Sequence, residues 1–222
     1  MQIRLVILII FISLKAVAQD TFRFQKEVLA IQQKYDTLWD NSKETIVFTG
    51  SSSIRTWKNL QELFPDYQIV NSGFGGSQAI DLLSYTNELI LEYNPKKVFI
   101  YEGDNDLNDR KKPKRIIQVT KEIIAKIRNY NPDTRIVLIS AKPSLARWHL
   151  KRKYKGLNRR FNRLCRNELD LDYANIWDIM LDGKKLRQDI FIEDGLHLND
   201  LGNSIWGASI KAALMPHEAR HE

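Results

Sequence analysis

The chain has 222 residues, of which 43% are hydrophobic, and it carries a formal net charge of +7. These values are typical of a globular protein with a sizeable core, and they exclude a disordered or fibrous chain. Cys165 is the only cysteine, so an internal disulfide is excluded. Because Cys165 lies in a helical pattern, we expect a packed or half-exposed thiol rather than a nucleophile.

The first 18 residues have the features of a secretory signal peptide. Arg4 precedes an apolar run from Leu5 to Leu14, and Ala16-Val17-Ala18 supplies small residues for cleavage. The apolar run is too short to span a bilayer. We therefore expect cleavage after Ala18, export to the periplasm or out of the cell, and no stable membrane insertion. Residues 19–222 are expected to form one domain.

Strand patterns alternate with helical patterns in the rest of the chain. Continuous apolar runs, typical of strands buried on both faces, occupy residues 45–49, 68–71, 97–102, 135–141 and 175–179. Helical patterns occupy residues 22–39, 77–93, 113–130, 145–169 and 200–215, with Ser77 as a candidate N-cap. This alternation predicts an α/β fold in which helices cover both faces of a parallel sheet.

Ligands of open parallel sheets bind at the carboxyl ends of the strands, so the loops that follow the strands are candidate sites. GSSS (Gly50 to Ser53) follows the first strand, NSGFGGSQ (Asn71 to Gln78) the second and EGDNDLND (Glu102 to Asp109) the third. EDGLHLND, Glu193 to Asp200, lies near the C-terminus.

These loops do not match the motifs of nucleotide or metal sites. NSGFGGSQ is not a dinucleotide fingerprint, and GSSS lacks the Gly-Lys-Ser/Thr ending of a P-loop. DNDLND begins like a calcium loop, but its sixth position is Asp109 and its twelfth is Arg115, where that loop needs Gly and Glu. We expect no metal or organic cofactor.

Acyl transfer needs a hydroxyl nucleophile, a base, an acid that orients the base, and donors for the oxyanion. His217 and His221 lie in a polar tail, and His149 lies among lysines and arginines. His197 follows Asp194 by three residues, a spacing that can place the carboxylate against the imidazole. A polar turn that only caps the last helix is the alternative for this pair.

The four loops resemble, in order and position, the blocks of the SGNH hydrolases, the GDSL-type esterases, lipases and acylhydrolases. The resemblance runs from Thr45 to about Ala213. It implies a flavodoxin-like three-layer α/β/α fold with a five-stranded parallel sheet. It also implies a serine esterase whose nucleophile is Ser52 and whose triad is completed by Asp194 and His197.

The same resemblance implies an oxyanion hole formed by the amides of Ser52 and Gly76 and the side chain of Asn105, with Gly75 as the alternative register. The chain departs from the family where Gly-Asp-Ser is expected, because Ser51 replaces the aspartate. We expect Ser51 to support the loop and Ser53 to cap the following helix. The effect of Ser51 on activity stays open.

The substrate is expected to be a small-molecule or polysaccharide ester with a short acyl group such as acetyl. Two basic segments, Arg110 to Arg115 and Arg147 to Arg166, follow the third and fourth strands and favour an anionic substrate, although they could be ordinary solvated surfaces. The candidate substrate contacts are Ser51, Phe74, Asp104 and Trp148. Trp57 and Trp206 are expected in the core.

Other functions are compatible with parts of the sequence. A lysophospholipase or other lipid acylhydrolase would use the same triad. A catalytically weak, glycan-binding domain of this fold would follow if Ser51 abolished activity. A phosphate-cofactor protein would leave Asp194 and His197 unexplained. A nucleic-acid binder is disfavoured by the expected export and by the lack of a basic-aromatic recognition motif.

Overall fold

The computed structural model describes residues 21–211. The expected signal peptide, the end of the expected last helix, His217 and His221 lie outside the described residues. Within residues 21–211, no helix is both long enough and apolar enough to cross a membrane.

The centre of the fold is a five-stranded parallel sheet with the order β2-β1-β3-β4-β5. Its strands are β1 (Thr45–Gly50), β2 (Gln68–Gly73), β3 (Lys97–Tyr101), β4 (Arg135–Ile139) and β5 (Leu171–Ala174). This is the flavodoxin-like order, in which the winding reverses next to β1. The predicted fold class is therefore confirmed, and the loops after β1 and β3 diverge from the switch point where ligands bind.

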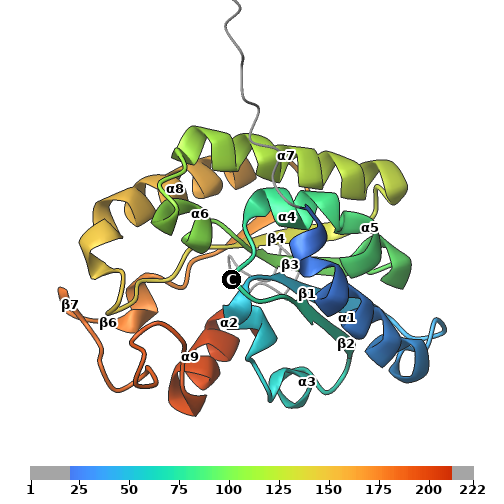
Figure 1. Ribbon diagram of the computed structural model, residues 1–222, viewed down its shortest axis with the longest axis horizontal. Helices are drawn as coiled ribbons and strands as arrows, with labels where there is room; N and C mark the ends of the chain where they lie inside the picture. Colours follow the sequence, from blue (N-terminus) through green and yellow to red (C-terminus); the bar gives the residue numbers. More distant parts are fainter. Residues whose placement is uncertain (1–20, 212–222) are drawn as a thin grey trace, which may run out of the picture.

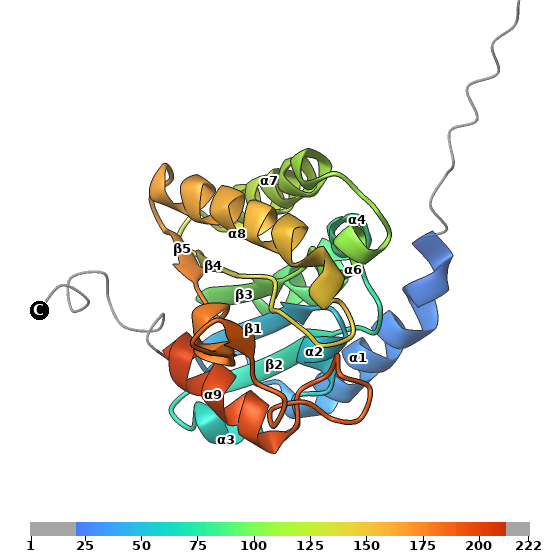
Figure 2. The same cartoon turned by 90° about the vertical axis from the view of Figure 1, so that its left-hand side faces the viewer.

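Helices cover both faces of the sheet, as Figures 1 and 2 show. One face packs against α1 (Gln25–Leu38), α4 (Ala79–Ser84), α5 (Thr86–Leu89), α7 (Pro113–Tyr130) and α8 (Lys151–Arg166). The other packs against α2 (Ser52–Arg55), α3 (Leu60–Leu63) and α9 (Asp200–Lys211). The remaining short elements are α6 (Asp104–Asn108), the 3-10 turns Thr21–Phe24, Leu91–Tyr93, Trp148–Leu150 and Asp178–Met180, and the pair β6 (Leu181–Asp182) and β7 (Lys185–Leu186).

Successive strand residues point to opposite faces, so each strand contributes to two separate cores. Val47 and Val98 belong to the core under α7 and α8, whereas Phe48 and Phe99 belong to the core above α3 and α9. The Phe48 and Phe99 rings stack with their centroids 4.4 Å apart. Both faces of the strands are apolar for this reason, which explains why their sequences show no alternation.

Trp57 and Trp206 are core residues, as predicted. They are 1% and 0% exposed, and their ring centroids lie 5.3 Å apart. Neither ring is available to a ligand. This contact anchors α9, the helix that follows the His197 segment, to the same core as the turn that follows Ser52.

The prediction of the fifth strand was wrong. The strand is Leu171–Ala174, and residues 175–179 leave the sheet. The Ile176 N–H donates to Ser140 Oγ (2.9 Å), and the Trp177 N–H donates to Asn175 Oδ1 (3.1 Å). The N–H groups of these two residues therefore donate to side-chain oxygens and not to the carbonyls of a neighbouring strand, so the chain leaves the sheet although Ile176 is buried.

The single helix predicted for residues 77–93 is broken into α4, α5 and a 3-10 turn. Thr86 Oγ1 donates to Leu82 O (2.8 Å) at the break, a back-bond that competes with the helical ladder. The predicted N-cap was also wrong. Gln78 is the N-cap, and its N–H donates to Asp81 Oδ2 (2.9 Å), which leaves Ser77 outside the helix.

The register of the strands aligns their carboxyl ends. Gly50 at the end of β1 pairs with Gly73 of β2 on one side and with Tyr101 of β3 on the other. The loops that carry Ser52, Gly76 and Asn105 consequently begin at the same edge of the sheet.

Gly50 cannot carry a side chain without moving β3. Its φ is +121°, and a Cβ would lie 2.0 Å from the Tyr101 carbonyl oxygen. We predict that Gly50→Ala lowers the free energy of unfolding by about 2 kcal/mol or more. The matched control is Gly156→Ala in α8, where a Cβ has no neighbour within 4 Å. This control should raise the free energy of unfolding by about 0.5–1 kcal/mol. Equal denaturant midpoints for the two variants would contradict this account.

Candidate active site

Ser52, His197 and Asp194 form a continuous hydrogen-bonded series. Ser52 Oγ lies 2.8 Å from His197 Nε2, and His197 Nδ1 lies 2.5 Å from Asp194 Oδ2. An ionised carboxylate can only accept, so Nδ1 carries the proton and Nε2 is the acceptor for the serine hydroxyl. The three residues that the sequence predicts as a triad are therefore within hydrogen-bonding distance of one another in series, although Ser52 and His197 are 145 residues apart in the chain.

Asp194 both builds the turn and orients the imidazole. Its Oδ1 accepts the N–H groups of Leu196 (2.8 Å) and His197 (2.9 Å), while Oδ2 contacts the ring. The last helix has a different capping residue, because Asn199 Oδ1 accepts the Gly202 N–H at 3.0 Å. The alternative in which Asp194 and His197 only cap this helix does not hold.

The pKa of Asp194 lies below its ordinary value. Burial opposes ionisation, but the hydrogen bonds from the His197 side chain and from the His197 and Leu196 backbones outweigh it. The carboxylate is thus held in the charged form that orients a protonated Nδ1.

Ser52 occupies the first position of α2, immediately after β1. Ser51 is the N-cap residue, so the prediction that Ser53 caps this helix was wrong. The Ser51 N–H donates to Tyr101 O (3.1 Å), and its carbonyl accepts the Ile54 N–H (2.9 Å). Ser51 is 2% exposed and supports the loop as expected, but its side chain is not placed to touch a substrate.

The loop after β2 presents an exposed amide that has no acceptor in the described part of the chain. The Gly75 N–H donates to Glu27 Oε1 (2.9 Å), so that amide is already engaged. Gly76 is exposed, has a φ of +74°, and its N–H makes no hydrogen bond within residues 21–211. The arrangement favours Gly76 over Gly75 as an oxyanion donor.

The Asn105 side chain is fixed from both ends. Its Nδ2 donates to Ser77 O (2.8 Å), and its Oδ1 accepts both terminal nitrogens of Arg147, each at 3.1 Å. Because a guanidinium can only donate, these contacts determine which end of the amide is the nitrogen. One of the two Nδ2 hydrogens is left over for a ligand.

The buried carboxylate of Asp104 accepts hydrogen bonds from three side chains and forms an ion pair with a fourth. Arg147 donates to Oδ1 at 2.5 Å, Tyr154 also donates to Oδ1, Tyr101 donates to Oδ2 at 3.1 Å, and Lys142 Nζ lies 3.9 Å from Oδ2. Burial opposes ionisation, but the two cations outweigh it and lower the Asp104 pKa. Asp104 is 3% exposed, so the expected substrate contact is contradicted and its role is internal.

Lys142 connects this carboxylate to the histidine segment. Its side chain is 0% exposed, and Nζ donates to Leu196 O (2.5 Å), one residue before His197. Burial lowers the Lys142 pKa, and Asp104 opposes that shift. Lys142 was not predicted as a site residue, although a lysine directly after a continuous apolar run was a usable signal in the sequence.

Two further carboxyl groups, those of Glu102 and Asp106, lie beside the loop that follows β2. Ser77 Oγ donates to Glu102 Oε1 (2.6 Å), and the Ala79 N–H donates to Asp106 Oδ2 (3.1 Å). Burial raises the pKa of Glu102 well above its ordinary value and the pKa of Asp106 to about 6. These groups hold the segment between Gly76 and α4 in place.

The aromatic side chains predicted to touch substrate differ in exposure. Phe74 is 0% exposed and packs edge-on against Phe24 with centroids 4.9 Å apart, so that prediction was wrong. Trp148 is half-buried and stacks on Trp177 at 6.2 Å. A substrate contact by Trp148 stays a prediction.

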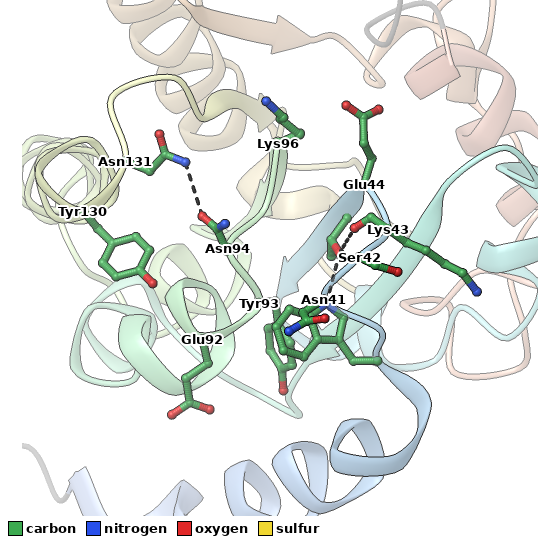
Figure 3. A pocket seen from close by; sticks show the side chains of 12 residues that line it. Asn41, Ser42, Lys43, Glu44, Glu92, Tyr93, Asn94, Lys96, Tyr130 and Asn131 are labelled. Atoms are coloured by element: carbon green, nitrogen blue, oxygen red, sulfur yellow. Dashed lines mark hydrogen bonds between the residues drawn. The ribbon is translucent and has the colours of Figure 1, made fainter.

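The structure describes no other centre that competes with this site. Within residues 21–211, no group of three or more His, Cys, Asp or Glu side chains could hold a metal ion. A hollow of about 710 Å³ lies where β1 and β3 begin, lined by Trp39, Glu44, Lys96 and other residues. Figure 3 shows this hollow, where Asn131 donates to Asn94 (3.3 Å). It is at the amino ends of the strands, whereas Ser52 follows a carboxyl end.

Comparison with known proteins gives consistent matches. The model of the GDSL-like Lipase/Acylhydrolase family matches residues 38–205. A Streptococcus pneumonia structure, provisionally named a platelet activating factor, has 26% identity and a TM-score of 0.75 over 86% of this chain and 94% of its own. A GDSL-like lipase from Bacteroides thetaiotaomicron has 19% identity and a TM-score of 0.70, over 88% of this chain and 97% of its own. A carbohydrate esterase family 3 structure from Talaromyces cellulolyticus has 16% identity and a TM-score of 0.64, covering 77% and 96%. No curated protein matches the chain.

We predict that Lys142→Met lowers kcat for p-nitrophenyl acetate by about tenfold or more with little change in KM, because a loosened His197 segment misplaces the base. It should also destabilise the fold by about 3 kcal/mol, since one member of a buried ion pair is removed. The control is Arg135→Met, which breaks the Arg135–Asp172 pair (2.7 Å) at the opposite end of the sheet. Arg135→Met should lower stability and keep kcat. Equal kcat losses in both variants would exclude a positioning role for Lys142.

Proposed function

The chain belongs to the GDSL-like lipase/acylhydrolase family, and we propose that it is an exported serine esterase that removes a short acyl group from a carbohydrate or envelope-type polymer. The chain is a hydrolase of ester bonds, as the family match shows. The observation that supports a serine esterase mechanism is the hydrogen-bonded series from Ser52 through His197 to Asp194.

In the proposed mechanism, Ser52 Oγ attacks the ester carbonyl while His197 Nε2 takes the hydroxyl proton. Asp194 stays ionised and stabilises the imidazolium. The carbon–oxygen bond to the alcohol then breaks, and His197 gives its proton to the leaving alkoxide. A water molecule, deprotonated by His197, attacks the acyl-serine and releases the carboxylic acid, which restores Ser52.

The negative charge that develops on the carbonyl oxygen is met by three donors. They are the amides of Ser52 and Gly76 and the free Nδ2 hydrogen of Asn105. Gly76 supports this assignment because its amide is uncommitted, and Asn105 because Arg147 and Ser77 hold its amide rigid. Donors fixed in advance stabilise a transition state without reorganising during the reaction.

The proposed substrate class and the proposed export rest on three lines of support. Two neighbours of the same fold are a carbohydrate esterase family 3 protein and an acetyl xylan esterase, and a transfer of their substrates to this chain is by analogy. The chain shows no long apolar lid segment after its first 18 residues, which favours a short acyl group. Export, to the periplasm or beyond the cell, rests on the signal-like sequence of those 18 residues.

We predict that Ser52→Ala and His197→Ala each reduce kcat/KM for p-nitrophenyl acetate by about a thousandfold or more, and Asn105→Ala by about a hundredfold. Ser51→Ala should have a smaller effect, because its backbone supports the loop.

Ser53→Ala is the matched control, since Ser53 lies in the same turn and makes no contact with His197 within the described residues. A Ser52→Ala enzyme as active as Ser53→Ala would refute the assignment of the nucleophile. Faster turnover of a lysophospholipid than of acetylated glycans would favour the lipid acylhydrolase alternative.

A further inference from the structure

The exposed face of α8 is basic along its whole length. Of the nine Lys and Arg residues between Arg147 and Arg166, only Arg147 turns inward, toward Asp104 and Asn105. The other eight are exposed: Lys151, Arg152, Lys153, Lys155, Arg159, Arg160, Arg163 and Arg166. The basic segment, for which the sequence predicts a helix over residues 145–169, therefore forms a helix with a basic exposed face.

These eight charges have no acidic partners in the part of the chain that the structure describes. None of them takes part in an ion pair within residues 21–211, and the segment between Arg147 and Arg166 contains no Asp or Glu. The neighbouring helix α7 differs, because Arg115 and Arg128 there pair with Glu122 and Glu168. Ordinary protein surfaces intersperse the two signs.

The charge pattern works against the stability of α8 itself. Lys151, Lys155, Arg159 and Arg163 follow each other at intervals of four residues, so like charges are neighbours on the helix surface. Three cations, Lys151 to Lys153, occupy the first turn, where the helix dipole favours acids, and no acid is present there. A helix selected only for stability and solubility would not keep this pattern.

α8 begins at the active edge of the sheet. It follows the loop that carries Lys142 and Arg147, and Arg147 contacts the proposed oxyanion residue Asn105. Its 16 residues extend for about 24 Å, at 1.5 Å per residue, along one side of the molecule next to α7 (Figures 1 and 2). A linear polymer lying on α8 would therefore have one end near Ser52.

We propose that the exposed face of α8 binds an acidic polysaccharide, the polymer that carries the ester removed at Ser52. This inference rests on the proposed esterase function. Among linear polyanions, acidic polysaccharides carry acyl esters on their hydroxyl groups, whereas nucleic acids do not. A membrane surface is disfavoured because the apolar face of α8, with Tyr154, Leu157 and Phe161, is buried in the core, and interfacial helices insert such a face.

The test is binding of the whole protein to polygalacturonate, which carries no ester, so that the result is independent of catalysis. The variant has four substitutions, Arg152→Gln, Arg159→Gln, Arg160→Gln and Arg163→Gln, none of which removes an ion pair or a side-chain hydrogen bond within the described residues. The control has Lys26→Gln, Lys58→Gln, Lys184→Gln and Lys185→Gln, which are exposed positions outside α8 and change the net charge equally.

At low salt, we expect the α8 variant to bind polygalacturonate about tenfold more weakly or worse, and with a smaller dependence on salt, while the control stays within about twofold of wild type. The melting temperature of the α8 variant should be unchanged or higher, because like charges have been removed. A structural role for these arginines would lower it instead.

The proposal is overturned if the control loses as much affinity as the α8 variant, because net charge alone would then explain binding. It is also overturned if wild type binds dextran, phosphatidylglycerol vesicles or single-stranded DNA as tightly as polygalacturonate. Neither result would bear on Ser52, whose role is tested by ester hydrolysis, and loss of that role would leave polygalacturonate binding intact.

Discussion

The candidate site depends on one buried carboxylate, that of Asp104. Asp104 binds Arg147, and Arg147 in turn fixes the side-chain amide of Asn105. Asp104 also neutralises Lys142, whose Nζ donates a hydrogen bond to the carbonyl of Leu196, the residue before His197. A charge removed from water is stable only when such partners surround it. The loops after β3 and β4 and the histidine segment are therefore joined through one ionic cluster, and their relative positions are set before a substrate arrives.

Charge is organised differently inside and outside the site. The inner cations, Lys142 and Arg147, are paired and serve geometry, whereas the cations on α8 are unpaired within the described residues and face solvent. The field of a buried cation that is paired with a carboxylate largely cancels at a distance. The exposed cations of α8 therefore provide the attraction for an anionic polymer. The two sets lie on one stretch of chain, and Arg147 marks the change from the outer to the inner role.

Much of the fold could be predicted because the central strands β1, β3 and β4 are buried on both faces and have largely apolar sequences. β5 could not, because the charged Asp172, which pairs with Arg135, interrupts its apolar pattern, while the apolar Ile176 packs outside the sheet. Asp194 and His197 were recognisable because their spacing is local. The role of Lys142 was not, because its partner Leu196 is 54 residues away.

The central claim is that Ser52 is a nucleophile activated by His197, and covalent labelling tests it most directly. A fluorophosphonate probe reacts with an activated serine, loses fluoride and leaves a stable phosphoryl adduct that peptide mass spectrometry can locate. Our account predicts a single adduct on Ser52 in the wild-type protein and a large loss of labelling rate in His197→Ala. An unlabelled protein, or an adduct on Ser51 or Ser53 instead, would contradict it.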